Sequence, residues 1–127
     1  MGWELAEDAW EPRGTLTVES HPLRGTTVGA GDVALLIDEL PVLMVAACAV
    51  EGVTTITGVQ ELRVKETDRL RSMTTGLARL GARVELRGSD QVCIHPGPLR
   101  GAEVDSMGDH RTAMSLAVAG LMAEGTT

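Results

Sequence analysis

The sequence predicts a mixed α/β fold built from a β-α-β-α-β-β unit, followed by the first part of a second copy of that unit. Three observations carry this prediction: an internal repeat, strand and helix periodicities that alternate along the chain, and helices that are apolar on nearly every face. The 127 residues are enough for one ordinary domain with a core. That core must be aliphatic, because the chain has two Trp and neither Phe nor Tyr.

The internal repeat sets the organisation of the chain. The segment 22–28, Pro-Leu-Arg-Gly-x-x-Val, recurs 76 residues later as 98–104. Two further segments recur at an offset of 73, so that one copy carries three extra residues in its loop: 43–46 recurs as 116–119, and 51–54 as 124–127. We therefore read residues 1–127 as a single partial domain, with a first repeat unit at about 15–90 and a truncated second unit at about 91–127.

The first copy opens with a strand, Thr15–Ser20, in which apolar and polar residues alternate. A loop follows, in which Gly29–Gly31 gives only a short turn signal. The first apolar helix runs from about Asp38, a good N-cap candidate, to Gly52, a natural C-terminal stop. Because this helix is apolar on nearly every face, we expect it to be buried.

The rest of the first copy reads as strand, helix and strand. Val53–Thr57 is the strand, and a polar segment over 60–69 precedes an amphipathic helix. Four apolar residues of that helix fall on one face at spacings of 3, 4 and 3: Leu70, Met73, Leu77 and Leu80. Ala82–Arg87 is the next strand. The second copy predicts a strand at Val92–His95 and a buried apolar helix from about Asp109 to Gly125.

Composition excludes several classes of protein. The 11 basic and 18 acidic residues give a net charge of −7, which disfavours a general binder of nucleic acid or of acidic membranes. The longest apolar run, 40–50, is too short to span a bilayer, and no N-terminal stretch has the form of a signal peptide. We therefore expect a soluble cytoplasmic protein. Cys48 and Cys93 lie in apolar surroundings without metal-ligand spacing, so we expect reduced core thiols and no metal site.

The densest polar cluster is Arg63, Lys65, Glu66, Asp68 and Arg69, at the predicted start of the amphipathic helix. Lys65 and Arg69 are four residues apart, so on a helix they would share a face and repel each other. The helix dipole also disfavours cations at this end. These two unfavourable placements predict a bound anion. The alternative is a solvated helix start, in which Glu66 and Asp68 supply the compensating charge.

A second cluster, Gly108-Asp109-His110-Arg111, lies at the predicted start of the second apolar helix. Capping explains Asp109 but not Arg111, whose position favours recognition of a carboxylate or phosphate. His110 alone is equally explained as a structural hydrogen-bonding residue. In the repeat register Asp38 falls at the place of Arg111, so the copies would present equivalent helix starts, one with a carboxylate and the other with a cation. Simple capping is the alternative for Asp38.

Three segments, in this order, resemble the 5-enolpyruvylshikimate-3-phosphate synthase family: Ile-Asp-Glu-Leu-Pro at 37–41, Glu-Leu-Arg-Val-Lys-Glu-Thr-Asp-Arg at 61–69, and Gly-Asp-His-Arg-x-Ala-Met at 108–114. The related UDP-N-acetylglucosamine enolpyruvyl transferases lack the second and third together. The resemblance implies a cytosolic shikimate-pathway enzyme that transfers the enolpyruvyl group of phosphoenolpyruvate to the 5-hydroxyl of shikimate 3-phosphate, releasing phosphate, with no cofactor. It also implies inside-out α/β barrels of three repeat units each, here incomplete.

The same resemblance implies roles for individual residues. Asp38 is similar to the family's aspartate that contacts the shikimate hydroxyls and accepts a proton. Lys65 matches the lysine that contacts the 5-hydroxyl and phosphoenolpyruvate, and Glu66 the glutamate that shuttles protons at the methylene carbon. Arg69 and Arg111 match the arginines that hold phosphoenolpyruvate. These residues are the catalytic and substrate-binding set that the resemblance implies.

His110 lies in the same shell by this resemblance, and Glu61 stands where some members have a shikimate-contacting Asn. The family's N-terminal Lys-Ser and Arg elements, its Ser-Ser-Gln loop and the Lys after the last helix are absent. We therefore expect a C-terminal-region fragment, somewhat under a third of the enzyme, inactive alone and completed by the remainder. The alternative is a non-catalytic structural or interaction module whose exposed edges favour self-association.

Overall fold

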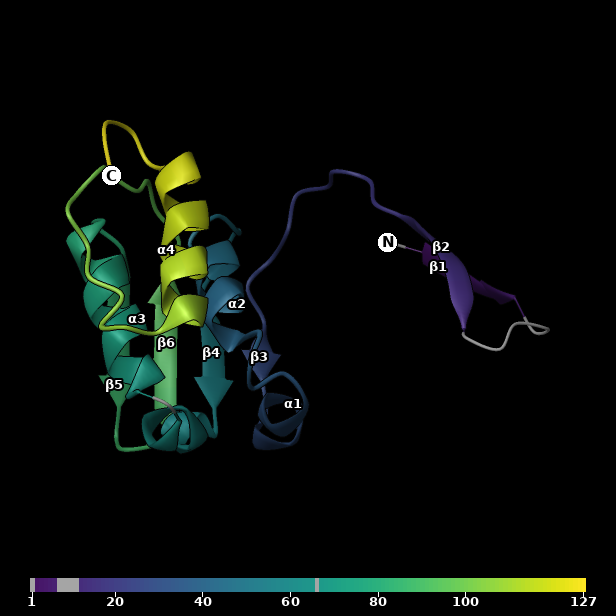
Figure 1. Ribbon diagram of the computed structural model, residues 1–127, viewed down its shortest axis with the longest axis horizontal. Coiled ribbons are helices and arrows are strands. Elements are labelled where there is room, and N and C mark those ends of the chain that lie inside the picture. The colour runs from purple at the N-terminus through teal and green to yellow at the C-terminus, as the bar shows by residue number, and fades with distance from the viewer. Residues whose placement is uncertain (1, 7–11, 66) are drawn as a thin grey trace.

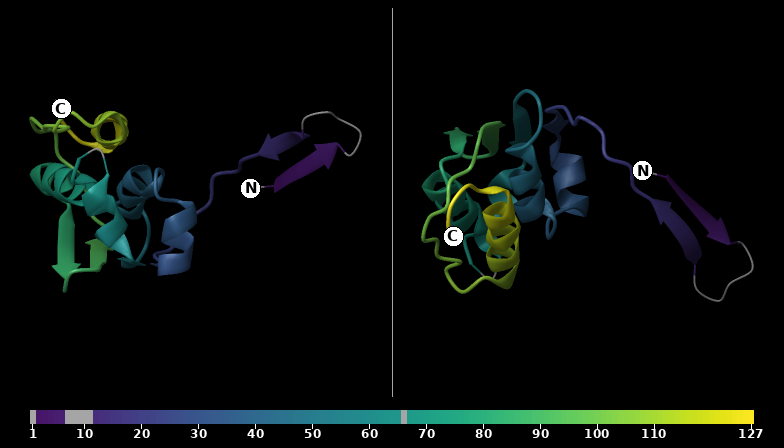
Figure 2. Two further views of the ribbon diagram at one scale, coloured as in Figure 1. Left: turned by 60° about the horizontal axis from the view of Figure 1, so that its bottom comes forward. Right: turned by 90° about the horizontal axis from the view of Figure 1, so that it is seen from above.

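The computed structural model describes residues 2–6, 12–65 and 67–127 of the chain. It contains a four-stranded mixed sheet, a separate two-stranded hairpin, and helices layered over one face of the sheet (Figures 1 and 2). The strands are β1 Gly2–Ala6, β2 Arg13–Thr17, β3 Thr27–Val28, β4 Thr54–Thr57, β5 Arg83–Arg87 and β6 Gln91–His95. The helices are α1 Ala30–Leu35, α2 Leu40–Ala47, α3 Arg69–Arg79 and α4 His110–Met122, with a 3₁₀ helix, η1, at Val59–Val64.

The order of strands in the larger sheet is β3-β4-β6-β5. β3 and β4 are parallel, whereas β6 is antiparallel to both β4 and β5. Val92, Cys93 and Ile94 of β6 are fully buried, because this strand is covered by a neighbour on each side and by helices on one face. The sheet includes residues on both sides of the boundary predicted near residue 90, and the division of the chain into units stays a prediction.

The first predicted strand, Thr15–Ser20, lies two residues earlier, as β2, and belongs to the hairpin and not to the larger sheet. β2 pairs antiparallel with β1, just as β6 pairs antiparallel with β5. Each is thus the second strand of a hairpin that precedes a Pro-Leu-Arg-Gly segment. Figure 1 shows the β1–β2 hairpin standing away from the helices and the larger sheet, and the side chains of β2 are exposed.

The two Pro-Leu-Arg-Gly segments make the same long-range contact, which confirms the repeat. Arg24 forms a parallel bridge with Glu51, and Arg100 forms one with Glu124. In each copy the following glycine donates its backbone N–H to the glutamate carbonyl at 2.6 Å. This pairing requires an extended backbone at the glutamate. The first apolar helix therefore ends at Ala47 and not at Gly52 as predicted.

The start of the first apolar helix also differs from the prediction. α2 begins at Leu40 after Glu39, whose side chain makes no capping hydrogen bond, so the assignment of Asp38 as N-cap is wrong. The Asp38 carboxylate is instead engaged by two arginines. α1, whose Val33 side chain is buried, occupies a region predicted as loop. Its six residues are too few to show a helical period in the sequence.

The amphipathic helix α3 is confirmed, and its four predicted apolar residues are at most 1% exposed. Asp68 caps it by accepting a hydrogen bond from the Arg71 backbone N–H at 2.9 Å. Lys65, however, lies before the helix in an extended conformation at the end of η1. Lys65 and Arg69 therefore do not share a helical face, and the repulsion predicted between them on such a face is wrong. Glu66 lies outside the described residues.

The second apolar helix, α4, is only partly buried. It packs on α2 and α3 through Leu116 and Ala119, which are 2% and 0% exposed. Its opposite face is apolar and exposed, with Leu121 88% accessible and three further apolar residues at 40% or more: Met114, Val118 and Met122. The expectation of a helix buried on all sides is thus wrong for α4, because the described chain supplies no layer above it (Figure 2).

Cys48 and Cys93 are buried free thiols, as predicted. Burial raises the pKa of the Cys48 thiol to about 11. None of the helices in residues 2–6, 12–65 and 67–127 is both long enough and apolar enough to cross a membrane.

Candidate active site

The site is organised by Asp109, the N-cap of α4. Its Oδ1 accepts hydrogen bonds from the backbone N–H groups of Arg111 and Thr112, at 2.9 and 3.0 Å. These are two of the N–H groups that a helix leaves without partners at its start. The predicted capping role of Asp109 is therefore confirmed.

The second oxygen of Asp109 reaches across to the start of α3. Oδ2 accepts hydrogen bonds from Arg69 Nε at 2.8 Å and from Thr67 Oγ1 at 3.1 Å. The Asp109 side chain is 0% exposed. Burial alone would raise its pKa, but the hydrogen bonds from Arg69, the Thr112 N–H and Thr67 outweigh burial and lower the pKa to about 2. Asp109 is thus a permanent carboxylate that joins the starts of two helices.

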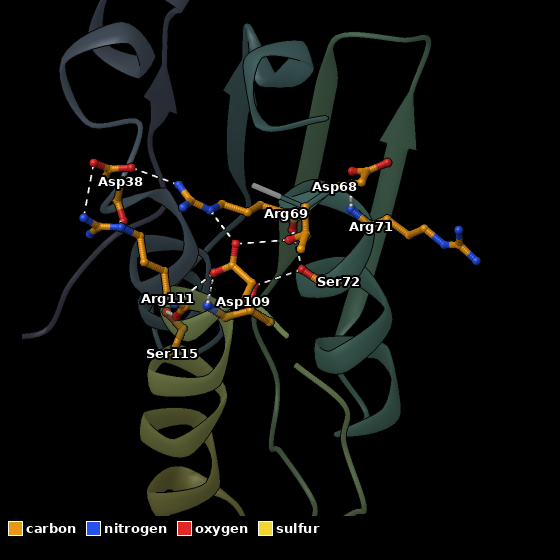
Figure 3. A network of polar contacts seen from close by, with 10 residues as sticks. Asp38, Asp68, Arg69, Arg71, Ser72, Asp109, Arg111 and Ser115 are labelled. Atoms are coloured by element: carbon orange, nitrogen blue, oxygen red, sulfur yellow. Dashed lines mark hydrogen bonds and ion pairs between the residues drawn. The ribbon is translucent and has the colours of Figure 1, made fainter. Parts of the chain in front are cut away.

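Asp38 lies between two arginines that come from different helices (Figure 3). Arg69 Nη1 donates to Asp38 Oδ1 at 2.9 Å, and Arg111 Nη2 lies 3.3 Å from Asp38 Oδ2. Arg111 Nη1 also donates to the Asp38 backbone carbonyl at 3.4 Å. The four side chains form a row of alternating charge in the order Asp109, Arg69, Asp38 and Arg111, with no net charge.

Exposure divides this row into a buried and an open end. The Arg69 side chain is 3% exposed, whereas Asp38 and Arg111 are 44% and 33% exposed. Burial lowers the pKa of the Arg69 guanidinium, but its contacts with Asp109 and Asp38 outweigh burial and raise that pKa above its ordinary value. Arg69 is therefore a fixed buried cation, and a ligand entering from solvent meets Asp38 and Arg111 first.

Buried hydroxyl groups form hydrogen bonds next to the charged side chains of this row. Ser72 Oγ and Thr112 Oγ1 lie 2.9 Å apart between α3 and α4, and Ser72 also donates to the Arg69 carbonyl at 3.1 Å. Ser115 donates to the Arg111 carbonyl at 2.7 Å. The Ser72–Thr112 contact joins the two helix starts, whereas the other two contacts lie within α3 and α4 at the carbonyls of the two arginines.

Two hollows lie beside the predicted residues. A hollow of about 230 Å³ is bordered by Asp38, Arg111 and the exposed face of α4. A second, of about 400 Å³, which we call the Lys65 hollow, is lined by eight residues of α1, η1, their flanking turns and the β5–β6 turn: Ala30, Ala34, Ile37, Gly58, Gln60, Glu61, Lys65 and Asp90. His110 is exposed at the first position of α4.

The structure thus brings together Asp38, Arg69 and Arg111, and places Lys65 with Glu61 at the other hollow. Glu66 is not among the described residues. Sequence reasoning missed the second role of Asp109, which was read as a cap alone. Nothing near Asp109 in the sequence signals that role, because its second partner, Arg69, lies 40 positions away. In the part of the chain that is described, no three His, Cys, Asp or Glu side chains form a metal-binding group.

Comparison with known proteins identifies the family of this arrangement. The family model for EPSP synthase (3-phosphoshikimate 1-carboxyvinyltransferase) matches residues 1–127. The 3-phosphoshikimate 1-carboxyvinyltransferase of Roseiflexus sp. (strain RS-1) is 52% identical over 117 residues, which are 92% of this chain and 27% of that protein. Its counterpart from Gloeobacter violaceus is 52% identical over 132 residues, covering 100% of this chain and 31% of that protein.

A solved structure agrees with the sequence relatives. EPSP synthase from Acinetobacter baumannii superposes with a TM-score of 0.76 at 39% identity, covering 82% of this chain and 25% of that one. The chain thus spans less than a third of the length of these proteins. With the whole of residues 1–127 matched by the family model, the chain belongs to the EPSP synthase family.

Proposed function

We propose that this chain supplies the phosphoenolpyruvate-binding part of an enzyme that transfers the enolpyruvyl group to the 5-hydroxyl of shikimate 3-phosphate, with release of phosphate, in the cytoplasm. One observation carries the proposal. Arg69 and Arg111, from the starts of two different helices, converge on a single acidic side chain, Asp38. Two guanidinium groups aimed at one point form a binding site for a small multivalent anion.

The charge of phosphoenolpyruvate suits such a site. Its carboxylate and phosphate need several cationic donors, and each arginine presents a planar fork of N–H groups to such oxygens. Arg69 is buried and held in place by Asp109, so it is already oriented before a ligand arrives. Preorganised donors of this kind stabilise charge that develops in a transition state without reorganising.

The Asp38 carboxylate lies between the two arginines and contacts both. An arriving anion therefore competes with the Asp38 carboxylate for Arg69 and Arg111. Once the anion takes over the N–H groups that Asp38 accepts, Asp38 is released toward the substrate. That release suits the role implied for Asp38, which is to contact the shikimate hydroxyls and accept a proton.

Lys65 and Glu66 complete the chemistry in this proposal. Lys65, exposed at its hollow beside Glu61, contacts the 5-hydroxyl and phosphoenolpyruvate. Glu66, the next residue, moves the proton at the methylene carbon. His110 precedes Arg111 at the start of α4 and adds a polar group near the bound substrates. A carboxylate next to a lysine can supply both an acid and a base.

Turnover tests the activity directly. The isolated chain, mixed with phosphoenolpyruvate and shikimate 3-phosphate, is expected to release almost no phosphate, because the groups that position the second substrate belong to the remainder of the enzyme. Full activity from residues 1–127 alone would contradict this part of the proposal.

Binding tests the arginines. Titration with phosphoenolpyruvate, or with the family's inhibitor glyphosate, should show weaker binding by at least about tenfold after Arg111→Ala, since a charge-assisted contact contributes about 1.5–3 kcal/mol. Arg71→Ala is the matched control, because the Arg71 side chain lies on α3 but points away from the row (Figure 3). Asp38→Asn should tighten binding by removing the competing carboxylate. Equal affinity in all four proteins would refute the assignment.

A second candidate function is a non-catalytic interaction module of the same fold. The observation that favours it is the exposed apolar face of α4, with Leu121 88% accessible. Contiguous apolar faces of this kind mark contact surfaces. Sedimentation separates the candidates: a module that self-associates through α4 gives dimers that Leu121→Lys dissolves, whereas a clean monomer that binds phosphoenolpyruvate favours the catalytic function.

A further inference from the structure

The 3₁₀ helix η1 is capped by a distant residue, Asp90, in the turn between β5 and β6. Gln60 N–H donates a hydrogen bond to Asp90 Oδ1 at 3.1 Å. The Asp90 carbonyl accepts the two preceding N–H groups, from Gly58 at 2.8 Å and from Val59 at 3.3 Å. Asp90 thus satisfies N–H groups that a helix leaves without partners at its start.

The residue that precedes η1 cannot provide this cap. Gly58 has a φ of +90° and has no side chain that could accept a hydrogen bond. Glycine adopts such a positive φ without strain. A larger residue does not fit either, because a Cβ at position 58 would lie 2.9 Å from both Cα and Cβ of Ala30. The cap of η1 therefore has to come from another segment of the chain.

Asp90 is held in place because it continues the pairing of two central strands. The last ladder pair of β4 and β6 joins Thr57 and Gln91. The bond from Gly58 N–H to the Asp90 carbonyl continues that register by one residue. Val92, the next residue of β6, is 0% exposed. Asp90 therefore ties the start of η1 to the buried part of the sheet.

η1 needs such support because of its length. Hydrogen bonds in a 3₁₀ helix have poorer geometry than in an α-helix, so runs of more than about 3–4 residues are uncommon. η1 has six residues, and Lys65 follows its last turn in an extended conformation. Thr67, just beyond, donates to Asp109 at 3.1 Å. Lys65 thus lies between two anchored points, and it lines the same hollow as Asp90.

We propose that Asp90 is a positioning residue for Lys65. By capping η1 from the β5–β6 turn, Asp90 holds the helix that carries Glu61 and Lys65 to the Lys65 hollow. It acts through the backbone of η1 and not through a contact with substrate. The inference rests on the proposed function, in which Lys65 contacts the 5-hydroxyl and phosphoenolpyruvate. The alternative is that the buried side chains of Val59 and Leu62, 1% and 0% exposed, hold η1 unaided.

The first measurement is the backbone order parameter of Lys65 in the full chain without ligand. Lys65 is the only lysine in the sequence, so lysine-specific isotope labelling identifies its signals. The order parameter should fall from about 0.85 to below about 0.6 in Asp90→Ala, because the Gln60 N–H loses its acceptor. Asp90→Asn should restore it, since an amide oxygen still accepts that bond.

Two controls accompany this measurement. Ser89→Ala is the matched variant, because it removes only the 2.9 Å bond from the Gln60 side chain to the same turn and leaves the backbone cap intact. Asp90 is half-buried in a turn, so the fold should tolerate its replacement by Ala. An unchanged order parameter at Val92 in β6 checks that it does.

The second measurement follows the side-chain εCH2 signal of Lys65 during titration with phosphoenolpyruvate. Its change in chemical shift at saturation should fall by at least about half in Asp90→Ala and recover in Asp90→Asn, because a displaced side chain loses its aligned contact with the ligand. A cap that only stabilised the fold would lower the urea midpoint and leave this change in shift as it is.

The outcomes separate this inference from the proposed function. Lower order at Lys65 in Asp90→Ala, with rescue by Asp90→Asn and none of the loss in Ser89→Ala, supports the inference. Equal order in Asp90→Ala and in the unmodified chain overturns it, and so does an equal response of Lys65 to phosphoenolpyruvate in both. If Lys65 does not respond to phosphoenolpyruvate in the unmodified chain, the contact assigned to it in the proposed function is refuted, whereas the order parameters still decide whether Asp90 holds Lys65.

Discussion

Replacement of Asp109 by Asn tests whether the buried ion pair with Arg69 holds α3 and α4 together. The substitution keeps the shape of the side chain, and its remaining oxygen can still accept the N–H groups that start α4. The new NH2 group, however, faces two donors, Arg69 Nε and Thr67 Oγ1. Arg69 then keeps Asp38 as its anionic partner, and that carboxylate is 44% exposed.

The expected cost of Asp109→Asn is large for a domain of this size. Breaking one side of a buried pair typically costs about 3–5 kcal/mol, against a total stability of about 5–15 kcal/mol. The lowered pKa of Asp109, which reflects its hydrogen bonds with Arg69, Thr112 and Thr67 together, gives a second figure. A shift from 3.8 to about 2 corresponds to about 2 kcal/mol of stability. We therefore expect the free energy of unfolding at pH 7 to fall by at least about 2 kcal/mol.

Urea denaturation at pH 7 measures this loss, with Asp68→Asn as the matched control. Asp68 also caps a helix, but through one backbone N–H and without a buried partner, so its replacement should cost about 1 kcal/mol or less. A double-mutant cycle with Arg69→Met isolates the pair, and we expect a coupling of about 2 kcal/mol. A loss below about 1 kcal/mol for Asp109→Asn, with no coupling to Arg69, would refute the reasoning.

The same contact predicts a pH dependence whose sign follows from the lowered pKa of Asp109. Because that pKa is lower in the folded chain, the contribution is present above the ordinary value of 3.8 and is lost as the pH falls toward about 2. The unfolding free energy of the unmodified chain should therefore fall more steeply between pH 4 and pH 2 than that of Asp109→Asn. Parallel pH profiles would show that Asp109 does not carry this stability.

Three further predictions concern residues outside the ion pair. Ser72→Ala should lower the free energy of unfolding by about 1–2 kcal/mol, because it leaves the buried Thr112 hydroxyl without the partner that lies 2.9 Å away. Urea denaturation measures this loss, and adding Thr112→Val should recover most of it. Gly31→Ala should raise the free energy of unfolding by up to about 1 kcal/mol, and the thermal midpoint with it, because Gly31 lies in α1 and a Cβ there meets nothing within 4 Å. A lower midpoint would contradict this. Cys48, which is 2% exposed with its thiol pKa raised to about 11, should react with a thiol reagent at pH 8 only after unfolding, and reaction in the native chain at the rate of a free thiol would disprove its burial.

Much of the fold was predictable because its signals are local. The period of four apolar residues located α3, and the strands predicted at 53–57, 82–87 and 92–95 begin within one residue of β4, β5 and β6. The Asp109 cap of α4 was readable from a single residue before an apolar helix. The six-residue α1 and the early end of α2 were not readable, because the first spans fewer than two turns and shows no period, and the second is set by the bridge of Glu51 to Arg24.

For the candidate site, the sequence predicted where Arg69 and Arg111 lie in the fold but not the contacts they make. Arg69 and Arg111 were expected at helix starts, and both lie there. Their partners were not expected, because the bonds of Arg69 to Asp38 and Asp109 join residues 31 and 40 positions apart. No periodicity reports a contact at such a separation. Lys65 could not be placed at its hollow, since the turn between η1 and α3 leaves no pattern in the sequence.

The sequence by itself determined that the chain repeats, that its core is aliphatic, and that Arg69 and Arg111 stand at helix starts. Periodicity and capping depend on residues that are close in the sequence, and composition needs no structure, so all three can be read from the sequence alone. Only the tertiary structure decided that Asp109 bridges two helices, that Asp38 lies between Arg69 and Arg111, and that one face of α4 stays open. Those features depend on how separate elements pack, and the energy of a buried charge is set by the groups that packing brings to it.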